Sequence, residues 1–226
     1  MCSVYEASVE NVSELRKRAK NVKRMINTAL RNGKSYEVET LTKVYAMMYS
    51  SFAEVAFIKM IHTPYGFDDN KSVHDDKIKQ ILNGRNLEEK WKKCMEFALA
   101  YLDKDGETAN KKQKLERILQ EYILNPSFIR NKIAHGQLKK CLNNECTRVN
   151  EDMTNKMSNL DYSQIDRYFK IYDLFSQIIE DLIESPQKAH YRNYYKRLVE
   201  LEEYIKKTND YCIEDKKNIL NRKKKN

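Results

Sequence analysis

The sequence predicts an all-α fold, an antiparallel up-and-down bundle of four main helices with extra helices. Glycine and proline occur only five and three times in 226 residues, too rarely for the many tight turns of an all-β fold. Apolar residues recur every three or four positions along most of the chain, which is the helical period. A hydrophobic content of 41% beside 33% charged residues argues against disorder over most of the length.

The apolar periodicity places the helices along the chain. Beside the segment that carries the motif described below, helices are expected over residues 4–30, 36–62, 76–82, 87–102, 108–124, 162–183 and 187–207. The breakers that should end them are Asn32-Gly33, Thr63-Pro64-Tyr65-Gly66, Asp105-Gly106 and Ser185-Pro186. Residues 141–160 are polar with poor periodicity, and they predict a loop or a small excursion.

These segments divide the chain into three parts. Residues 1–185 are expected to form the helical bundle, and residues 186–208 a C-terminal helix that extends it. Residues 209–226 end in a run of basic side chains, and we expect them to form a flexible, solvated tail.

The charge balance suggests a class of partner. The net charge is +9 with a pI near 9.1, which favours a polyanion such as nucleic acid or an anionic membrane. A chain rich in lysine and asparagine is, however, equally often basic for compositional reasons alone. The most apolar window, 44–61, is interrupted by polar and charged residues and predicts a buried helix rather than a membrane span.

The cysteines and the N-terminus bear on the compartment. An odd count of five cysteines without regular close spacing favours reduced thiols over a disulfide framework. The start of the chain does not resemble a signal peptide, and we expect a cytoplasmic protein with no membrane partner. Cys141 and Cys146 are the only close pair and have no histidine at ligand spacing, so neither a metal site nor a cofactor is predicted.

One stretch, residues 128–137, combines residues of unusual chemistry on a helix that Asn125-Pro126 should open. Arg130 and His135 lie five positions apart, about 140° around a straight helix, so they do not share a face. Asn131 and His135 lie four apart and do share one. Arg130 and His135 could converge if the helix end is distorted near glycine, or if the ligand lies at a two-fold interface.

The chemistry that uses these residue types without a metal is phosphodiester transfer in RNA. Histidine can take the proton of the 2′-hydroxyl or give one to the leaving 5′ oxygen, and arginine can stabilise the phosphate. Two proton-transfer groups are needed and the motif supplies one histidine, His135, so a homodimer that pairs two copies is expected. Asn131 would hold the imidazole in one tautomer or contact the scissile phosphate.

Other residues near the motif have two interpretations each. Glu54 is either a boundary residue paired with a lysine or a carboxylate that orients Arg130. Lys132, Lys139 and Lys140 either bind RNA phosphates or are simply solvated. The motif itself could be an ordinary helix C-cap, with glycine ending the helix and the helix dipole stabilising the histidine.

Arg130-Asn131-Lys132-Ile133-Ala134-His135-Gly136 resembles the signature of the HEPN superfamily, Arg followed after four to six residues by His. The resemblance implies an all-α bundle, commonly a homodimer, with the motif at the dimer interface. Many members are metal-independent endoribonucleases of toxin–antitoxin, abortive-infection and CRISPR-linked antiviral defence systems. By resemblance, Arg130 and His135 are catalytic, and Asn131 matches the polar position that often follows the arginine.

The expected function is therefore cleavage of RNA by internal transesterification, with an antitoxin or sensor protein as a possible further partner. One alternative is a non-catalytic HEPN-like module that binds RNA, a nucleotide or a partner protein. Another is a helical protein in which the motif is accidental.

Overall fold

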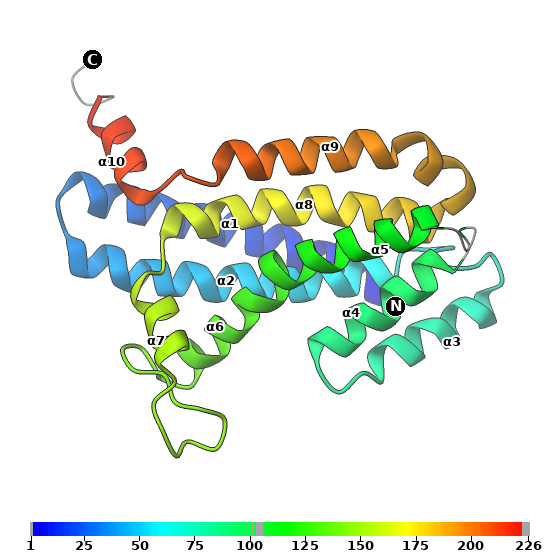
Figure 1. Cartoon of the computed structure of the whole chain (residues 1–226), viewed down its shortest axis with the longest axis horizontal. Helices are drawn as coiled ribbons and strands as arrows, with labels where there is room; N and C mark the ends of the chain where they lie inside the picture. The colour runs from blue at the N-terminus through cyan, green and yellow to red at the C-terminus, as the bar shows by residue number, and fades with distance from the viewer. Residues whose placement is uncertain (1, 101, 103–105, 223–226) are drawn as a thin grey trace.

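The computed structural model describes residues 2–100, 102 and 106–222, and among these it contains helices and no strand, which confirms the all-α prediction (Figure 1). One isolated antiparallel bridge joins Leu142 and Val149. The helices are α1 (Val4–Arg31), α2 (Ser35–Ile61), α3 (Lys71–Leu82), α4 (Leu87–Leu99), α5 (Gly106–Leu119), the π-helix η1 (Gln120–Leu124), α6 (Asn125–Ala134), α7 (Glu151–Ser158), α8 (Tyr162–Glu184), the π-helix η2 (Pro186–His190), α9 (Tyr191–Thr208) and α10 (Ile213–Arg222).

Most helix boundaries follow local signals in the sequence. Ser3 and Glu6 form a reciprocal capping box that starts α1, and Gly33 at φ +67° follows its end. Asn70 caps α3, which begins five residues before the expected start of that helix. Helix α4 ends at Leu99, three residues short of the prediction, and the predicted break at Asp105 lies outside the described residues.

The core lies around α2, which packs against α1, α6 and α8. Aromatic rings fill the seam between α2 and α8, where Phe169 lies 5.1 Å from both Tyr49 and Phe52 between ring centroids. Trp91 of α4 is completely buried beside Phe57 and extends this seam. The long helices α1, α2, α8 and α9 run side by side, and the α5–η1–α6 helix runs obliquely across α2 and α8 (Figure 1).

The junction before the motif differs from the prediction. Asn125-Pro126 does not open a new helix, because α5, η1 and α6 form one continuous helix through it. Pro126 has no N–H to donate to the carbonyl oxygen of Tyr122 four residues earlier. The buried hydroxyl of Tyr49 donates to that oxygen at 2.5 Å instead. Burial raises the pKa of Tyr49 well above its usual value, so this hydroxyl keeps its proton.

The C-terminal residues also differ from the prediction of a flexible tail from residue 209. Residues 213–222 form α10, which contacts α1 and α8 and buries Leu220. Asp161, the N-cap of α8, accepts hydrogen bonds from the backbone N–H of Ser163 at 2.6 Å and of Ile213 at 2.9 Å. One carboxylate therefore fixes the start of both α8 and α10. Residues 223–226 lie outside the described part of the chain.

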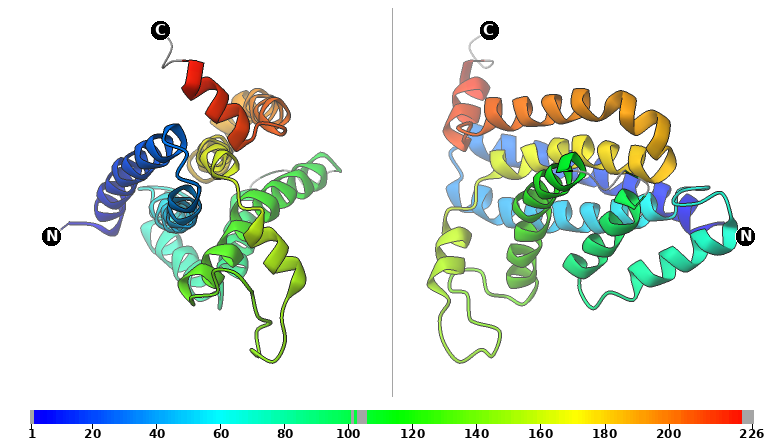
Figure 2. Two further views of the ribbon diagram at one scale, coloured as in Figure 1. Left: turned by 90° about the vertical axis from the view of Figure 1, so that its left-hand side faces the viewer. Right: turned by 45° about the vertical axis from the view of Figure 1, so that its right-hand side comes forward.

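Residues 141–160 contain a loop, as expected, followed by the short helix α7. The end of α6, this loop and α7 project from the body on the side away from α9 and α10 (Figures 1 and 2). Asn150 caps α7 by accepting a hydrogen bond from the backbone N–H of Met153 at 2.9 Å. The candidate motif therefore lies at the base of a projection that one continuous segment, the end of α6 through α7, builds.

Among the described residues, α2 is the one helix long and apolar enough to cross a membrane by length and composition. Half of its most apolar 18-residue window is buried inside the molecule. The cytoplasmic location and the absence of a membrane partner stay predictions.

Candidate functional site

The motif lies at the C-terminal end of α6, which ends in a Schellman arrangement. His135 is the C-cap residue, and Gly136 follows at φ +74°, a conformation that glycine adopts without steric cost. The N–H of Gly136 donates to the carbonyl of Ile133 at 3.0 Å, and that of Gln137 to the carbonyl of Lys132 at 2.9 Å. The glycine is thus explained by the helix end, as the C-cap interpretation expects, while His135 stays exposed to solvent.

Arg130 contacts Glu54, the carboxylate that the sequence suggested for it. The guanidinium Nη2 pairs with Oε1 of Glu54 on α2, across the contact between α2 and α6. The Arg130 side chain is 27% exposed and that of Glu54 is 40% exposed. The Nε of Arg130 is buried and has no hydrogen-bond partner among the described residues. The pair exists, whereas the orienting role of Glu54 stays a prediction.

Arg130 and His135 open into two different pockets. Arg130 and Glu54 line a pocket of 310 Å³, and His135 lines a groove of 820 Å³ on the other side. Phe128 and Asn131 line both, so they form the ridge between them. The helix is regular up to Ala134, so no distortion of its end brings the arginine and the histidine together. Of the two expected ways to converge, only the pairing of two copies remains, and it is untested.

The predicted phosphate-binding lysines have different surroundings. The Nζ of Lys132 donates to the carbonyl of Leu142 at 2.7 Å, so its charge holds the loop against the helix. Lys139 and Lys140 are exposed in the segment that follows α6. The hydrogen bond and the charge of Lys43 lower the pKa of Glu39 near the start of α2, and the charge of Lys139 lowers it further. A role for these lysines in binding RNA stays a prediction.

The groove beside His135 is built in part by a segment in which no site residue was predicted. The N–H of Leu142 donates to Oε1 of Gln137 at 2.7 Å, opposite the bond from Lys132 to the carbonyl of the same residue. Gln137, Asn150 and Met153 line the groove together with His135. Gln137 is part of the motif stretch 128–137, whereas Asn150 and Met153 belong to 141–160, which the sequence marked only as polar with poor periodicity.

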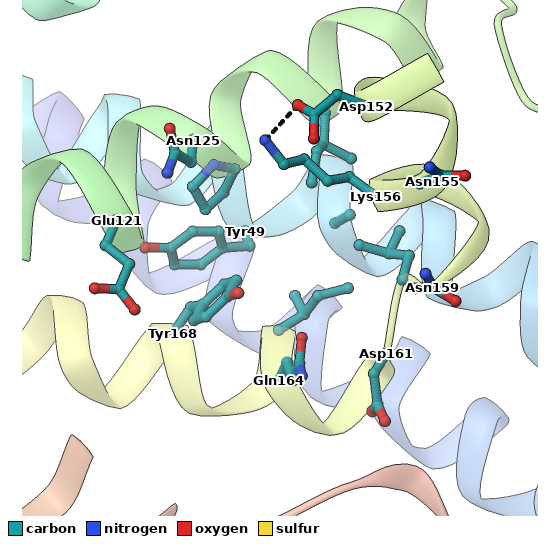
Figure 3. Close-up of a pocket in the computed structure, with 15 residues that line it drawn as sticks. Tyr49, Glu121, Asn125, Asp152, Asn155, Lys156, Asn159, Asp161, Gln164 and Tyr168 are labelled. Atoms are coloured by element: carbon teal, nitrogen blue, oxygen red, sulfur yellow. Dashed lines mark hydrogen bonds and ion pairs between the residues drawn. The ribbon is translucent and has the colours of Figure 1, made fainter. Parts of the chain in front are cut away.

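A third cavity, of 370 Å³, lies between α2, α6, α7 and α8 (Figure 3). Tyr49 and Tyr168, with ring centroids 5.6 Å apart, lie side by side in it, and Lys156 reaches along one edge to pair with Asp152 at 2.7 Å. None of the predicted site residues lines this cavity. It is separate from the motif.

The described residues contain no group of three or more His, Cys, Asp and Glu side chains placed to hold a metal ion. All five cysteines are free, with Cys94 and Cys141 buried and Cys146 exposed. Burial raises the pKa of the Cys94 thiol, which favours its protonated, unreactive form.

Comparisons of the chain with models of protein families, with curated proteins and with solved structures found no match. The functional inference therefore depends on the motif and on the geometry around it.

Proposed function

We propose that the chain is a HEPN-like, metal-independent endoribonuclease that acts as a homodimer, its helices forming the bundle of that superfamily. The observation that carries the proposal is the placement of the motif. Asn131 and His135 are exposed on α6 beside an open groove, and Arg130 is held by Glu54 next to a second pocket. None of these three polar side chains is buried in the core, so each is at least partly open to solvent, as a catalytic role requires.

The proposed reaction is internal transesterification. A histidine takes the proton of the 2′-hydroxyl, and the 2′ oxygen attacks the phosphorus while the bond to the 5′ oxygen breaks. A second histidine gives a proton to that leaving oxygen, and the products are a 2′,3′-cyclic phosphate and a 5′-hydroxyl. Arg130 stabilises the charge that grows on the phosphate oxygens, and its contact with Glu54 limits the directions in which its fork can point.

The proposed dimer would supply what one chain lacks. A single copy supplies one His135, and that histidine opens into a different pocket from Arg130. In the proposed dimer the two copies of the motif face one another and enclose one cleft. His135 of the partner subunit then supplies the second proton-transfer group.

The test is RNA cleavage by the purified chain in EDTA. Wild type should cleave and leave 2′,3′-cyclic phosphate ends, and His135→Ala should lower the rate by at least about 100-fold, the usual contribution of a general acid or base. His62→Ala is the matched control, because His62 is the C-cap of α2 with nearly the same backbone angles. Cleavage that requires a metal, or that survives His135→Ala, would contradict the mechanism.

A second candidate is a non-catalytic module that binds RNA, a nucleotide or a partner protein. The separation of Arg130 and His135 into two pockets favours it, because one chain presents no assembled catalytic site. Tight RNA binding without any cleavage, equal in wild type and His135→Ala, would support this module. An antitoxin or sensor that covers the exposed ridge is compatible with either function.

A further inference from the structure

The groove beside His135 contains two amide side chains, those of Gln137 and Asn150, whose oxygens already accept backbone hydrogen bonds. Oε1 of Gln137 accepts from the backbone N–H of Leu142 at 2.7 Å, and Oδ1 of Asn150 accepts from the backbone N–H of Met153 at 2.9 Å. A backbone N–H can only donate, so the atom that it meets in each amide must be oxygen. These two bonds fix the orientation of both amides.

The NH₂ group of each of these two side chains can only donate. Neither the NH₂ of Gln137 nor that of Asn150 has a hydrogen-bond partner among the described residues, and both residues line the groove. Asn143, by contrast, uses both ends of its amide within the loop, since its NH₂ donates to Glu145 at 2.8 Å. The groove thus combines two oriented NH₂ groups with an aromatic ring, Phe128, that is 44% exposed.

A flat ring with hydrogen-bond acceptors on one edge fits these groups. Unpaired RNA bases are commonly read by stacking on an aromatic side chain and by hydrogen bonds to their edges. Uracil offers two carbonyl oxygens, and guanine offers O6 and N7 on one edge, whereas adenine places an NH₂ donor beside its acceptor. Two NH₂ groups in the protein satisfy the keto bases and meet a donor on adenine.

We infer that this groove is a base-binding subsite that selects a keto base, uracil or guanine, next to the scissile phosphate. The inference rests on the proposed function for the choice of RNA as ligand, and it adds the substrate class. Gln137 and Asn150 are the specificity-determining residues, and Phe128 is the stacking platform. His135 lines the same groove, which places the selected base beside the proposed chemistry.

The test measures binding of the four ribonucleoside monophosphates, which the enzyme cannot cleave, through the NMR signals of the side-chain NH₂ groups. UMP, GMP or both should shift the Gln137 and Asn150 signals, and AMP should bind at least about fivefold more weakly. Gln137→Glu keeps the oxygen that Leu142 needs but removes the NH₂, so the ratio of keto base to AMP should fall toward or below one. The new negative charge repels the phosphate of every nucleotide equally, so this repulsion does not change the ratio of the two affinities.

Asn150→Asp is the second variant, because aspartate caps a helix as well as asparagine does and α7 should survive. Asn70→Asp is the control, since Asn70 is also a side-chain N-cap, accepting from the N–H of Ser72 at the start of α3, and does not line the groove. Equal binding of AMP and the keto bases, no binding at all, or an unchanged ratio in both groove variants would overturn the inference. If the chain prefers keto bases but cleaves no RNA, only the proposed nuclease activity is overturned. If it cleaves RNA but shows no base preference, only the proposed subsite is overturned.

Discussion

The two sides of α6 use the same short helix for different purposes. On the side toward the core, Ile133 is buried and Arg130 pairs with Glu54 of α2. On the other side, Phe128 is 44% exposed and both Asn131 and His135 are open to solvent. The core-facing side holds the helix in place, so the exposed side can carry aromatic and polar groups that the fold does not need. Substitutions on the exposed side should therefore affect activity with little loss of stability, whereas Ile133 on the core-facing side should matter mainly for stability.

The largest separation is expected between two apolar residues of α6. Ile133→Ala removes buried methyl groups and should lower the free energy of unfolding by about 2–5 kcal/mol. Phe128→Ala should change it by less than about 1 kcal/mol, because much of that ring is already in water. Denaturant unfolding measures both, and RNA cleavage or nucleotide binding measured on the Phe128 variant should fall although the fold is intact. A Phe128 variant as unstable as the Ile133 variant would show that the ridge belongs to the core.

The next effect concerns the support beneath α6. Tyr49→Phe removes the hydroxyl that donates to the carbonyl oxygen of Tyr122, which receives no N–H from Pro126. The free energy of unfolding should therefore fall by about 1–3 kcal/mol. Tyr36→Phe is the matched control, because Tyr36 is 83% exposed and should change stability very little. Thermal or denaturant unfolding of the two variants makes the comparison. Equal stability would mean that another group satisfies this carbonyl.

The smallest effect on stability is expected at the ion pair. Glu54→Gln keeps an oxygen near Arg130 and removes the charge, and with both side chains partly exposed the loss should stay below about 1 kcal/mol. If Glu54 positions Arg130, kcat for RNA cleavage should fall well beyond this loss while the melting temperature barely moves. Glu180→Gln breaks a similarly exposed pair with Lys59 between α8 and α2 and serves as control. Equal kcat in the two variants would leave Glu54 with a structural role only.

The sequence predicted helices where local signals decide the structure. The serine and glutamate at the start of α1, Gly33 after its end and the stripe along α8 each act within a few residues. The continuous helix through Pro126 was mispredicted, because it depends on Tyr49, more than seventy positions away in the chain. The tail was mispredicted for the same kind of reason, since α10 begins where Asp161 of a distant helix accepts its N–H.

The candidate site divides in the same way. Arg130, Asn131 and His135 were visible as a short motif, and a contact between Glu54 and Arg130 was one of two possibilities considered. The groove could not be predicted from the sequence, because the orientation of its amides is fixed only when the N–H groups of Leu142 and Met153 donate to their oxygens. A donor surface created by internal hydrogen bonds leaves no pattern in composition or spacing.

The π-helix η1 sets the angle at which α6 is rotated about the helix axis relative to α5. A π turn holds more residues than an α turn, and each residue of an α-helix advances the chain by about 100°. If the five residues Gln120–Leu124 adopted α geometry instead, α6 would rotate by about that angle relative to α5. Arg130 would then point away from Glu54, and the residues of the ridge would turn with it. The side of the molecule on which the motif emerges is therefore set by the wider π turn several positions before it.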